Sequence, residues 1–244
     1  MSARQHDDGV KHNDMDTLPN VNITEVSQCA EPAFSAIPEA RSSHTGVSVE
    51  YAHDADKKWF VFRASYGRED IAADLLIEEG VYAYVPKRYK WREVNGRPKK
   101  VLENLISNLV FAYLNGKEAD IYVRNNDPLT PSPNPRLSTI ISYYYDHFTV
   151  MEYGKNPPLT VSDEEMRNFI LATRTHDENL MLLQPGGYRF KGDDEVLVTV
   201  GPFKGVRGRV VRANRQQRVL VRLSGVCLCT TAYIPSPFLE RIDS

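Results

Sequence analysis

The stretch of sequence best suited to chemistry is a short basic segment that also carries aromatic residues. Between residues 87 and 100 the chain has seven basic side chains and a single acidic one, Glu93. Tyr89 and Trp91 interleave with the basic residues, which are Lys87, Arg88, Lys90, Arg92, Arg97, Lys99 and Lys100. Basic side chains neutralise phosphates and aromatic rings stack on exposed bases, so the segment predicts proximity to nucleic acid. The alternative is a solvated hairpin whose lysines discourage edge-to-edge aggregation.

A second candidate segment, residues 192–211, is rich in glycine and predicts a strand, a turn and a returning strand. A phosphate-binding loop is one interpretation of Gly201, Gly205 and Gly208. It fails because Phe203 occupies the middle of any G-x-G-x-x-G register and no G-K-[ST] follows. We therefore expect these glycines to serve turns and close backbone approach.

The sequence shows no pattern typical of catalysis or metal binding. His147 and His176 are isolated, and there is neither an H-E-x-x-H motif nor a nucleophile elbow. The acidic residues 193–195 are consecutive, so strand alternation separates their side chains and favours surface charge over a metal site. Cys227 and Cys229 share one face of a predicted strand, lack further ligands nearby, and are expected to be buried, inert thiols. We expect no enzymatic activity, no metal and no cofactor.

Composition limits the class of protein. A chain of 244 residues with 41% apolar and 10% aromatic content is expected to form one or two domains, each with a hydrophobic core. No apolar run approaches the roughly 18 residues of a membrane span, and the polar, acidic N-terminus does not resemble a secretory signal. Three cysteines, an odd number, suggest a reducing compartment. These features predict a cytoplasmic protein with no membrane partner.

The overall net charge of −2 hides an uneven distribution along the chain. Residues 1–56 carry a net charge of −7 and residues 117–190 carry −3. Residues 57–116 and 191–244 each carry +4. Two mildly basic segments in an acidic chain predict local contact with nucleic acid.

Hydrophobic patterns in the first half of the chain predict strands, a helix and a hairpin. Residues 69–79 have helical spacing, with Glu69 and Asp70 at the favourable N-terminal end and Gly80 as a stop signal. Asn95-Gly96 is a strong hairpin signal. The predicted strands are residues 59–64, 81–92, 98–105 and 109–114.

Further along, the chain predicts a loop at residues 126–135, a strand at 140–151 and a second helix. Ser162 and Glu165 have the spacing of a capping box at the start of that helix. Its inward face is expected to contain Met166, Phe169, Ile170 and Thr173. The polar segment 176–190, with one proline and two glycines, is interpreted as a linker.

The last segment alternates in the manner of short strands. Val196, Val198 and Val200 are expected to share a face, residues 214–217 predict a turn, and residues 226–234 predict a further strand. About five short strands in so few residues are typical of a small barrel. The predicted organisation is therefore a disordered acidic tail (1–56), an α+β sandwich with an antiparallel sheet (57–175), a linker (176–190) and a small all-β barrel (191–244).

Both halves contain motifs of one known family. The N-terminal half has the tryptophan–aromatic strand at residues 58–62, the turn at 66–69, the Val-Pro strand at 84–86 and the segment 107–111. In that last segment Ser107 and Leu109 replace the usual proline and aromatic residue. The C-terminal half has Gly192, Asp193, Val196, Val198, Gly201, Pro202, Phe203, Gly205 and Gly208 in register. From residue 57 to 244 the chain resembles a NusG-type elongation factor, with an NGN domain followed by a KOW domain.

Several other segments resemble the specialised members of this family. They are the acidic N-terminal extension, the tyrosine-rich residues 142–148, and residues 156–161 and 227–235. Together they look like the antiterminators encoded at capsular-polysaccharide loci. The resemblance then implies a factor that suppresses pausing or termination at polysaccharide-biosynthesis operons.

The resemblance also implies partners and binding residues. Arg63, Leu109 and Phe111 are expected to contact RNA polymerase on an exposed sheet edge; the alternative is that Leu109 and Phe111 are core. The basic segment is expected near the non-template DNA strand or the nascent RNA. Phe203, Lys204 and Arg207 are expected to bind a ribosomal protein or a termination factor, unless Phe203 is buried. The alternative function is an RNA- or ribosome-binding KOW protein without a polymerase role.

Overall fold

A computed structural model describes residues 53–124, 132–146, 156–183 and 189–242, without the side chains of 189–194. The predicted acidic tail therefore lies outside the described residues except for its last four positions. Most of the predicted loop at residues 126–135 also lies outside the described residues.

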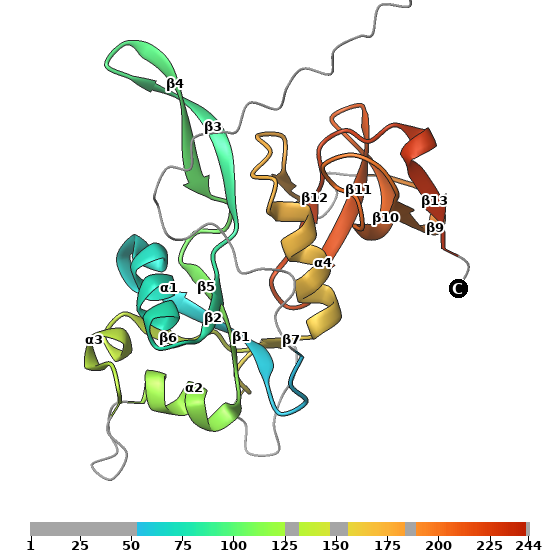
Figure 1. The fold of residues 1–244 in the computed structure, drawn as a ribbon. Coiled ribbons are helices and arrows are strands. Elements are labelled where there is room, and N and C mark those ends of the chain that lie inside the picture. Colours follow the sequence, from blue (N-terminus) through green and yellow to red (C-terminus); the bar gives the residue numbers. More distant parts are fainter. Residues whose placement is uncertain (1–52, 125–131, 147–155, 184–188, 243–244) are drawn as a thin grey trace, which may run out of the picture. The chain divides into compact units, whose positions relative to one another are not determined.

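The N-terminal part is built on a five-stranded antiparallel sheet, shown in Figure 1. Its strands are β1 (Lys58–Ala64), β2 (Tyr82–Tyr84), β5 (Leu109–Leu114), β6 (Ile141–Tyr143) and β7 (Thr160–Val161). The order is β2-β5-β1-β6, and β7 also pairs with β1. Strand β5 is buried along its whole length, which accounts for its uninterrupted apolar sequence. The predicted antiparallel sheet with helices is confirmed.

The helices of this part are η1 (Ser65–Gly67), α1 (Glu69–Glu78), α2 (Gly116–Val123), α3 (Pro135–Ser138) and α4 (Asp163–Thr173). Helix α1 begins at Glu69, as predicted, and the chain leaves it through Gly80, whose φ is +78°. Helix α2 was not predicted from the hydrophobic pattern. Its start is held by a complete capping box, in which Asn115 and Glu118 bond to each other's backbone N–H groups.

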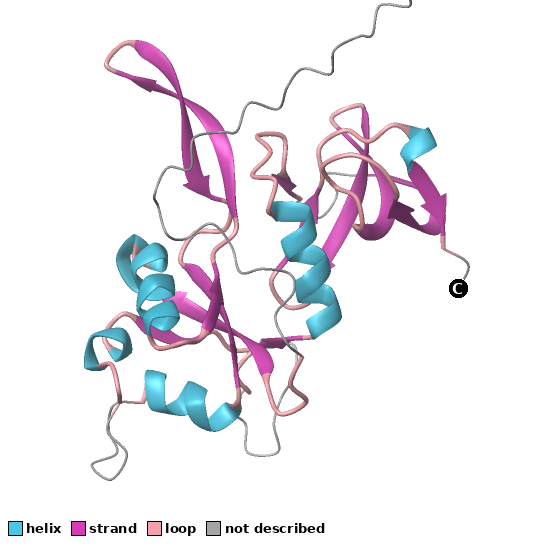
Figure 2. Cartoon of the chain, in the orientation of Figure 1, coloured by secondary structure: helices cyan, strands magenta, loops and turns pink. Residues whose placement is uncertain are grey.

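The two faces of the sheet bury different side chains, because neighbouring residues of a strand point to opposite sides. Phe60 and Phe62 of β1 belong to a core cluster shared with α1 and α3. Trp59 and Val61 belong to the cluster on the other face, which includes residues of α4. Figure 2 shows helices and strands mixed in this part, whereas the C-terminal part is almost entirely β.

The C-terminal part forms a six-stranded antiparallel sheet in the order β13-β9-β10-β11-β12-β8. Its strands are β8 (Met181–Leu182), β9 (Arg189–Val198), β10 (Arg207–Ala213), β11 (Gln216–Leu223), β12 (Cys227–Thr230) and β13 (Leu239–Arg241), with the short helix η2 (Ser236–Phe238) before β13. The predicted all-β C-terminal region is confirmed: β9 to β13 are the five short strands expected, and β8 adds a sixth strand from the preceding segment.

Several predicted boundaries were wrong. The linker interpretation of 176–190 missed β8, whose Met181 and Leu182 pair with β12, and the first residues of β9. Val200 is 51% exposed because β9 ends at Val198. The strand expected at 226–234 covers only Cys227–Thr230. The strand expected at 140–151 is also shorter: β6 covers only Ile141–Tyr143, and residues 147–151 lie outside the described residues.

Candidate functional site

The basic hairpin consists of β3 (Lys87–Val94) and β4 (Arg97–Asn104), which form a separate two-stranded sheet. Figure 1 shows it projecting from the five-stranded sheet. Its turn contains Asn95 and Gly96 with φ of +53° and +71°, as the Asn-Gly signal predicted. The backbone N–H of Tyr89 donates to the carbonyl oxygen of His176 at 2.8 Å and anchors the base of the hairpin.

Strand register sorts the predicted nucleic-acid residues onto two faces of this hairpin. Arg92 lies opposite Lys99, and Val94 lies opposite Arg97. Alternation then places five basic residues on one face, which we call the basic face: Arg88, Lys90, Arg92, Arg97 and Lys99. Both aromatic residues lie on the other face together with Lys87 and Lys100. The cations of the basic face and the two aromatic rings are therefore presented on opposite surfaces of the hairpin.

Two of the predicted residues at the hairpin base are engaged with the rest of the protein. Lys87 is buried, and its Nζ lies 2.9 Å from Oδ1 of Asp70 on α1. Arg88 donates from Nη1 to the carbonyl oxygen of Leu180 at 2.9 Å. These contacts fix the root of the hairpin, so Lys87 is not available to a nucleic-acid strand in this conformation.

Two further cations of the hairpin have acidic partners. Arg92 donates from Nε to Glu103 at 2.5 Å and from Nη2 to the same carboxylate at 3.2 Å. The hydrogen bond from Arg92 lowers the pKa of Glu103, which keeps the pair charged. Lys100 lies 3.3 Å from Glu178 and 5.1 Å from the ring centroid of Tyr89.

The remaining cations of the basic face are open to solvent on at least one side. Lys90, Arg97 and Lys99 form no ion pair with any residue in the described ranges. Trp91, on the opposite face, is 59% exposed. A nucleic acid bound to the basic face would have its phosphates neutralised by these cations. A base could stack on Trp91 only if the nucleic acid also contacted the opposite face of the hairpin.

The sheet residues predicted to contact a polymerase have unequal exposure. Arg63 is exposed at the end of β1, with its guanidinium carbon 5.8 Å from the ring centroid of Tyr144. Leu109 and Phe111 are buried, at 7% and 0% exposure. The expectation of an exposed sheet edge was wrong, because β5 lies between β2 and β1. Leu109 and Phe111 do share a face, as alternation predicted.

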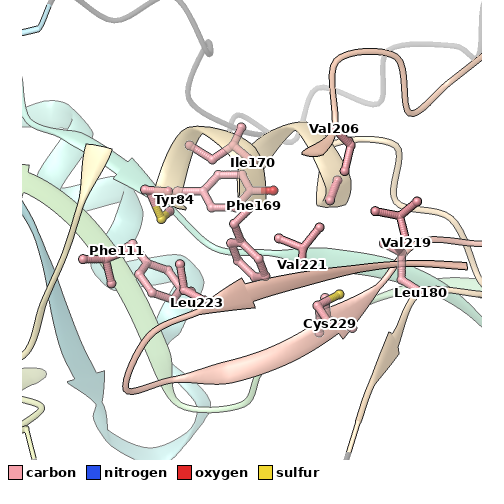
Figure 3. Packing of buried hydrophobic residues seen from close by; sticks show 14 of the residues in the cluster. Tyr84, Phe111, Phe169, Ile170, Leu180, Val206, Val219, Val221, Leu223 and Cys229 are labelled. Atoms are coloured by element: carbon pink, nitrogen blue, oxygen red, sulfur yellow. The ribbon is translucent and has the colours of Figure 1, made fainter. Parts of the chain in front are cut away.

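Phe111 lies in an apolar cluster that α4 helps to close, shown in Figure 3. Its ring centroid is 6.0 Å from that of Phe169 on α4. The same cluster includes Leu223 of β11, which is labelled with Phe111 in Figure 3. Phe111 is therefore inaccessible to a partner unless some of these neighbours withdraw.

Helix α4 makes polar contacts on both sides, and the apolar pattern alone did not predict them. The Tyr84 hydroxyl on β2 lies 2.6 Å from Oγ1 of Thr173, with both side chains buried. Near the other end of the helix, Ser224 donates from Oγ to Glu165 at 2.6 Å. The predicted capping box at Ser162 is therefore only half formed: Ser162 accepts from the backbone of Glu165, while the Glu165 carboxylate binds Ser224.

One more side chain of α4 recognises the backbone of β10. Asn168 donates from Nδ2 to the carbonyl oxygen of Arg207 at 2.7 Å and accepts from the N–H of Arg207 at 2.8 Å. A carboxamide that satisfies both groups of one residue acts like a strand partner. A signal for this role was absent from the sequence, because asparagine on a helix face is usually solvated.

The loop of the glycine-rich segment holds its aromatic residue inward. Phe203 is 5% exposed and belongs to the same core cluster, so the expectation of an exposed contact was wrong. Gly201 and Gly205 have φ of +88° and +92°, and the hydrogen bond from Lys204 N to Gly201 O tightens the turn. Lys204 and Arg207 are exposed, as predicted. The structural role proposed for the glycines is confirmed.

The thiols and acids do not assemble a reactive site within the described residues. Burial raises the pKa of the Cys227 thiol to about 12 and also raises that of Cys229. In the described ranges no three His, Cys, Asp or Glu side chains gather in a way that could hold a metal ion. Among the described helices none is long and apolar enough to cross a membrane.

Comparison with known families agrees with the two-part architecture. Residues 57–170 match the family model of NusG, described as a transcription termination factor, and residues 193–222 match the model of the KOW motif. No curated protein matches the chain. The two matches together indicate a transcription elongation or termination factor. The chain thus carries a NusG-type N-terminal domain followed by a KOW motif.

Proposed function

We propose that the protein binds RNA polymerase in the cytoplasm and suppresses pausing or termination, without enzymatic activity, at polysaccharide-biosynthesis operons. The observation that supports this most is the NusG-type domain with its projecting basic hairpin. The operon class is supported by the tyrosine-rich residues 142–148 and by segments 156–161 and 227–235.

The proposed polymerase contact begins at Arg63. This side chain is exposed beside Tyr144, and it lies on the same sheet face as Leu109 and Phe111. A partner helix would meet the cation first and reach Phe111 only after Phe169 and other members of the cluster move away. An exposed cation beside a half-buried aromatic ring, with an apolar cluster beneath, suits an amphipathic helix.

The proposed nucleic-acid contact uses the basic face of the hairpin. Lys90, Arg97 and Lys99 form no ion pair with the described residues and would neutralise phosphates of the non-template DNA strand. Arg88, Arg92 and Lys100 contribute to the local potential but already have hydrogen-bonded or ionic partners.

The proposed second partner of the C-terminal domain is a ribosomal protein or a termination factor. Lys204 and Arg207 are exposed on the glycine-rich loop and are suited to an acidic rim on that partner. Phe203 would support this surface from beneath, since its ring is buried.

The first test is a pull-down of the tagged protein with core RNA polymerase. The parent should retain polymerase. An Arg63→Glu variant should bind polymerase at least about tenfold more weakly, because it reverses a charge at the edge of the proposed interface. The matched control is Arg222→Glu, which reverses an exposed arginine on β11. Equal binding by the two variants would refute the docking face. No binding by the parent, with ribosome association that ribonuclease abolishes, would instead favour an RNA- or ribosome-binding protein.

A second assay addresses the hairpin on paused elongation complexes. Lys90→Glu/Lys99→Glu should reduce pause suppression while leaving polymerase retention intact. Trp91→Ala, on the opposite face, is the control and should have little effect if phosphate contact dominates. A larger effect from Trp91→Ala would assign the contact to base stacking instead.

A further inference from the structure

Residues 176–183 join helix α4 to the C-terminal strands, and we call them the connecting segment. The linker interpretation does not account for Leu180 in the middle of this segment. Its side chain is fully buried and belongs to the same core cluster as Phe111. A linker without anchors lets two parts of a chain move independently, whereas a segment held along its length passes the position of one part to the other.

On one side, the connecting segment holds the root of the basic hairpin. The carbonyl oxygen of Leu180 accepts from Nη1 of Arg88 on β3 at 2.9 Å. On β4, the Nζ atom of Lys100 lies 3.3 Å from Glu178. Both strands of the hairpin are therefore attached to the segment, in addition to the backbone bond from Tyr89. A two-stranded hairpin is only marginally stable alone in water, so the contacts at its root determine its direction.

On the other side, the C-terminal strands hold the same segment. The buried Arg218 of β11 donates from Nη1 to the carbonyl oxygen of Asn179 at 2.5 Å. The same Nη1 donates to the carbonyl oxygen of Thr231, the residue after β12, at 2.9 Å. Further along, the N–H of Leu183 donates to the carbonyl oxygen of Leu228 at 2.9 Å. Strand β8 pairs with β12 between these points, so the end of the segment is part of the C-terminal sheet.

Two arginines from different parts of the fold thus hold consecutive carbonyl oxygens of the connecting segment. Arg218 holds that of Asn179, and Arg88 holds that of Leu180. A guanidinium presents its N–H donors in a rigid planar fork, so it restrains the direction of its acceptor as well as the distance. A displacement of β11 therefore moves Asn179 and, one peptide later, the acceptor on which the hairpin root depends.

We propose that the C-terminal strands orient the basic hairpin through the connecting segment, with Arg88 and Arg218 as positioning residues. Strand register places Arg88 on the basic face, but its Nη1 donates to Leu180. Arg88 therefore directs the other cations of that face and does not itself bind a phosphate. Only the use of the oriented hairpin rests on the proposed function, since its orientation can be measured without nucleic acid or polymerase.

Distances between two spin labels in the full-length protein would measure this orientation. The labels are attached through Glu93→Cys near the hairpin tip and Ser142→Cys on β6, where both native side chains are exposed. The background is Cys29→Ser/Cys227→Ser, which leaves only the buried native Cys229. Double electron–electron resonance then gives the distribution of distances between the labels, which should be narrow in the parent protein.

Variants on both sides of the connecting segment should broaden this distribution. Arg88→Ala removes the contact with the hairpin, and its width should rise at least about twofold, because the hairpin alone cannot fix its own direction. Leu183→Pro removes the N–H that attaches the segment to β12, and Arg218→Lys removes the planar fork. Both should also broaden the distribution, although neither alters the hairpin itself. The matched control is Arg92→Ala, because Arg92 binds Glu103 within the hairpin, and it should leave the width unchanged.

A salt titration separates positioning from direct phosphate contact. The probe is a labelled oligodeoxythymidine, whose affinity is measured by fluorescence anisotropy. Arg88→Ala should bind it more weakly than the parent does, with an unchanged slope of log affinity against log salt. Lys90→Ala should lower that slope by about 0.7, as expected for the loss of one phosphate contact, and should keep the narrow distance distribution.

Four results would overturn the proposal. The first is a distance distribution in the parent as broad as that of Arg88→Ala. The second is equal broadening by the Arg92→Ala control. The third is an unchanged distribution in both Leu183→Pro and Arg218→Lys, which would show that the N-terminal half alone holds the hairpin. The fourth is a lower salt slope in Arg88→Ala without broadening, which would assign Arg88 to a phosphate. Failure of the parent to bind oligodeoxythymidine would instead refute the proposed nucleic-acid contact, and broadening by the three variants would still support the positioning roles.

Discussion

The hydrogen bond between Tyr84 and Thr173 makes a sharp prediction about how α4 is attached to the sheet. The two oxygens lie 2.6 Å apart, and the side chains are almost completely buried. Thr173 donates its single hydroxyl hydrogen to the carbonyl oxygen of Phe169 at 2.7 Å, so Tyr84 must be the donor of the shared bond. Removing the Tyr84 hydroxyl should therefore lower the free energy of unfolding by a different amount from removing the Thr173 hydroxyl.

The asymmetry follows from which group is left unpaired. Tyr84→Phe removes a donor, and Thr173 still donates to Phe169, so the expected loss is about 1 kcal/mol. Thr173→Val leaves the Tyr84 hydroxyl buried without an acceptor, so the expected loss is about 2–3 kcal/mol. The double variant replaces both polar groups with apolar groups of similar shape. It should be more stable than Thr173→Val alone, with a total loss of about 1 kcal/mol.

Urea unfolding followed by tryptophan fluorescence would measure these differences. The chain has two tryptophans, Trp59 buried in the N-terminal sheet and Trp91 exposed on the hairpin. All variants should therefore carry Trp91→Phe, so that the signal reports the N-terminal domain alone. Losses that simply add in the double variant, or a larger loss for Tyr84→Phe than for Thr173→Val, would contradict the bond and its direction.

Three further predictions concern single residues. A Cβ at Gly208 would lie 2.0 Å from a backbone oxygen of β11, so Gly208→Ala should destabilise the protein by at least about 3 kcal/mol in thermal unfolding. Burial lowers the pKa of His176 below 6.5, so the unfolded chain takes up a proton at a higher pH than the folded protein does. The contribution of the neutral His176 to the free energy of unfolding should therefore be fully present above about pH 6.5 and should be lost as the pH falls below that value. His176→Asn, which tolerates the +50° φ, should flatten this dependence in urea titrations at several pH values. In a Cys29→Ser background, the buried Cys229 should react with iodoacetamide at about pH 8 only after unfolding, and the half-buried Cys227, whose pKa is raised by burial, should react slowly; labelling of Cys229 in the native protein would contradict its burial.

Local sequence patterns predicted most of the N-terminal elements because each pattern has one dominant physical cause. The continuous apolar run of β5 marks a strand buried on both faces, and Asn95-Gly96 marks a turn with two positive φ values. Helix α1 carries acidic residues at its start and glycine after its end. None of these signals depends on distant parts of the chain.

The wrong predictions concern residues whose environment is set by distant contacts. Alternation correctly placed Leu109 and Phe111 on one face, yet it cannot show that β2, β1 and α4 surround them. The same limit applies to Phe203, since a loop aromatic that packs inward has the same local sequence as one that faces solvent. Exposure is a property of the assembled fold, and it decides whether an apolar residue binds a partner or stabilises the core.

The capping box at α4 shows how a tertiary contact can override a local rule. Ser162 and Glu165 have the expected spacing, and the serine does accept from the helix backbone. The Glu165 carboxylate instead receives two hydrogen bonds from Ser224, at 2.6 Å from its hydroxyl and at 3.3 Å from its N–H. A charged acceptor with two donors is worth more than a solvent-exposed cap, so the tertiary contact prevails. Helix α4 therefore belongs by sequence to the N-terminal domain, while two of its polar side chains bind the C-terminal part: Glu165 binds the turn after β11, and Asn168 binds β10. A polymerase helix that reached Phe111 would have to compete with these contacts as well as with the apolar cluster.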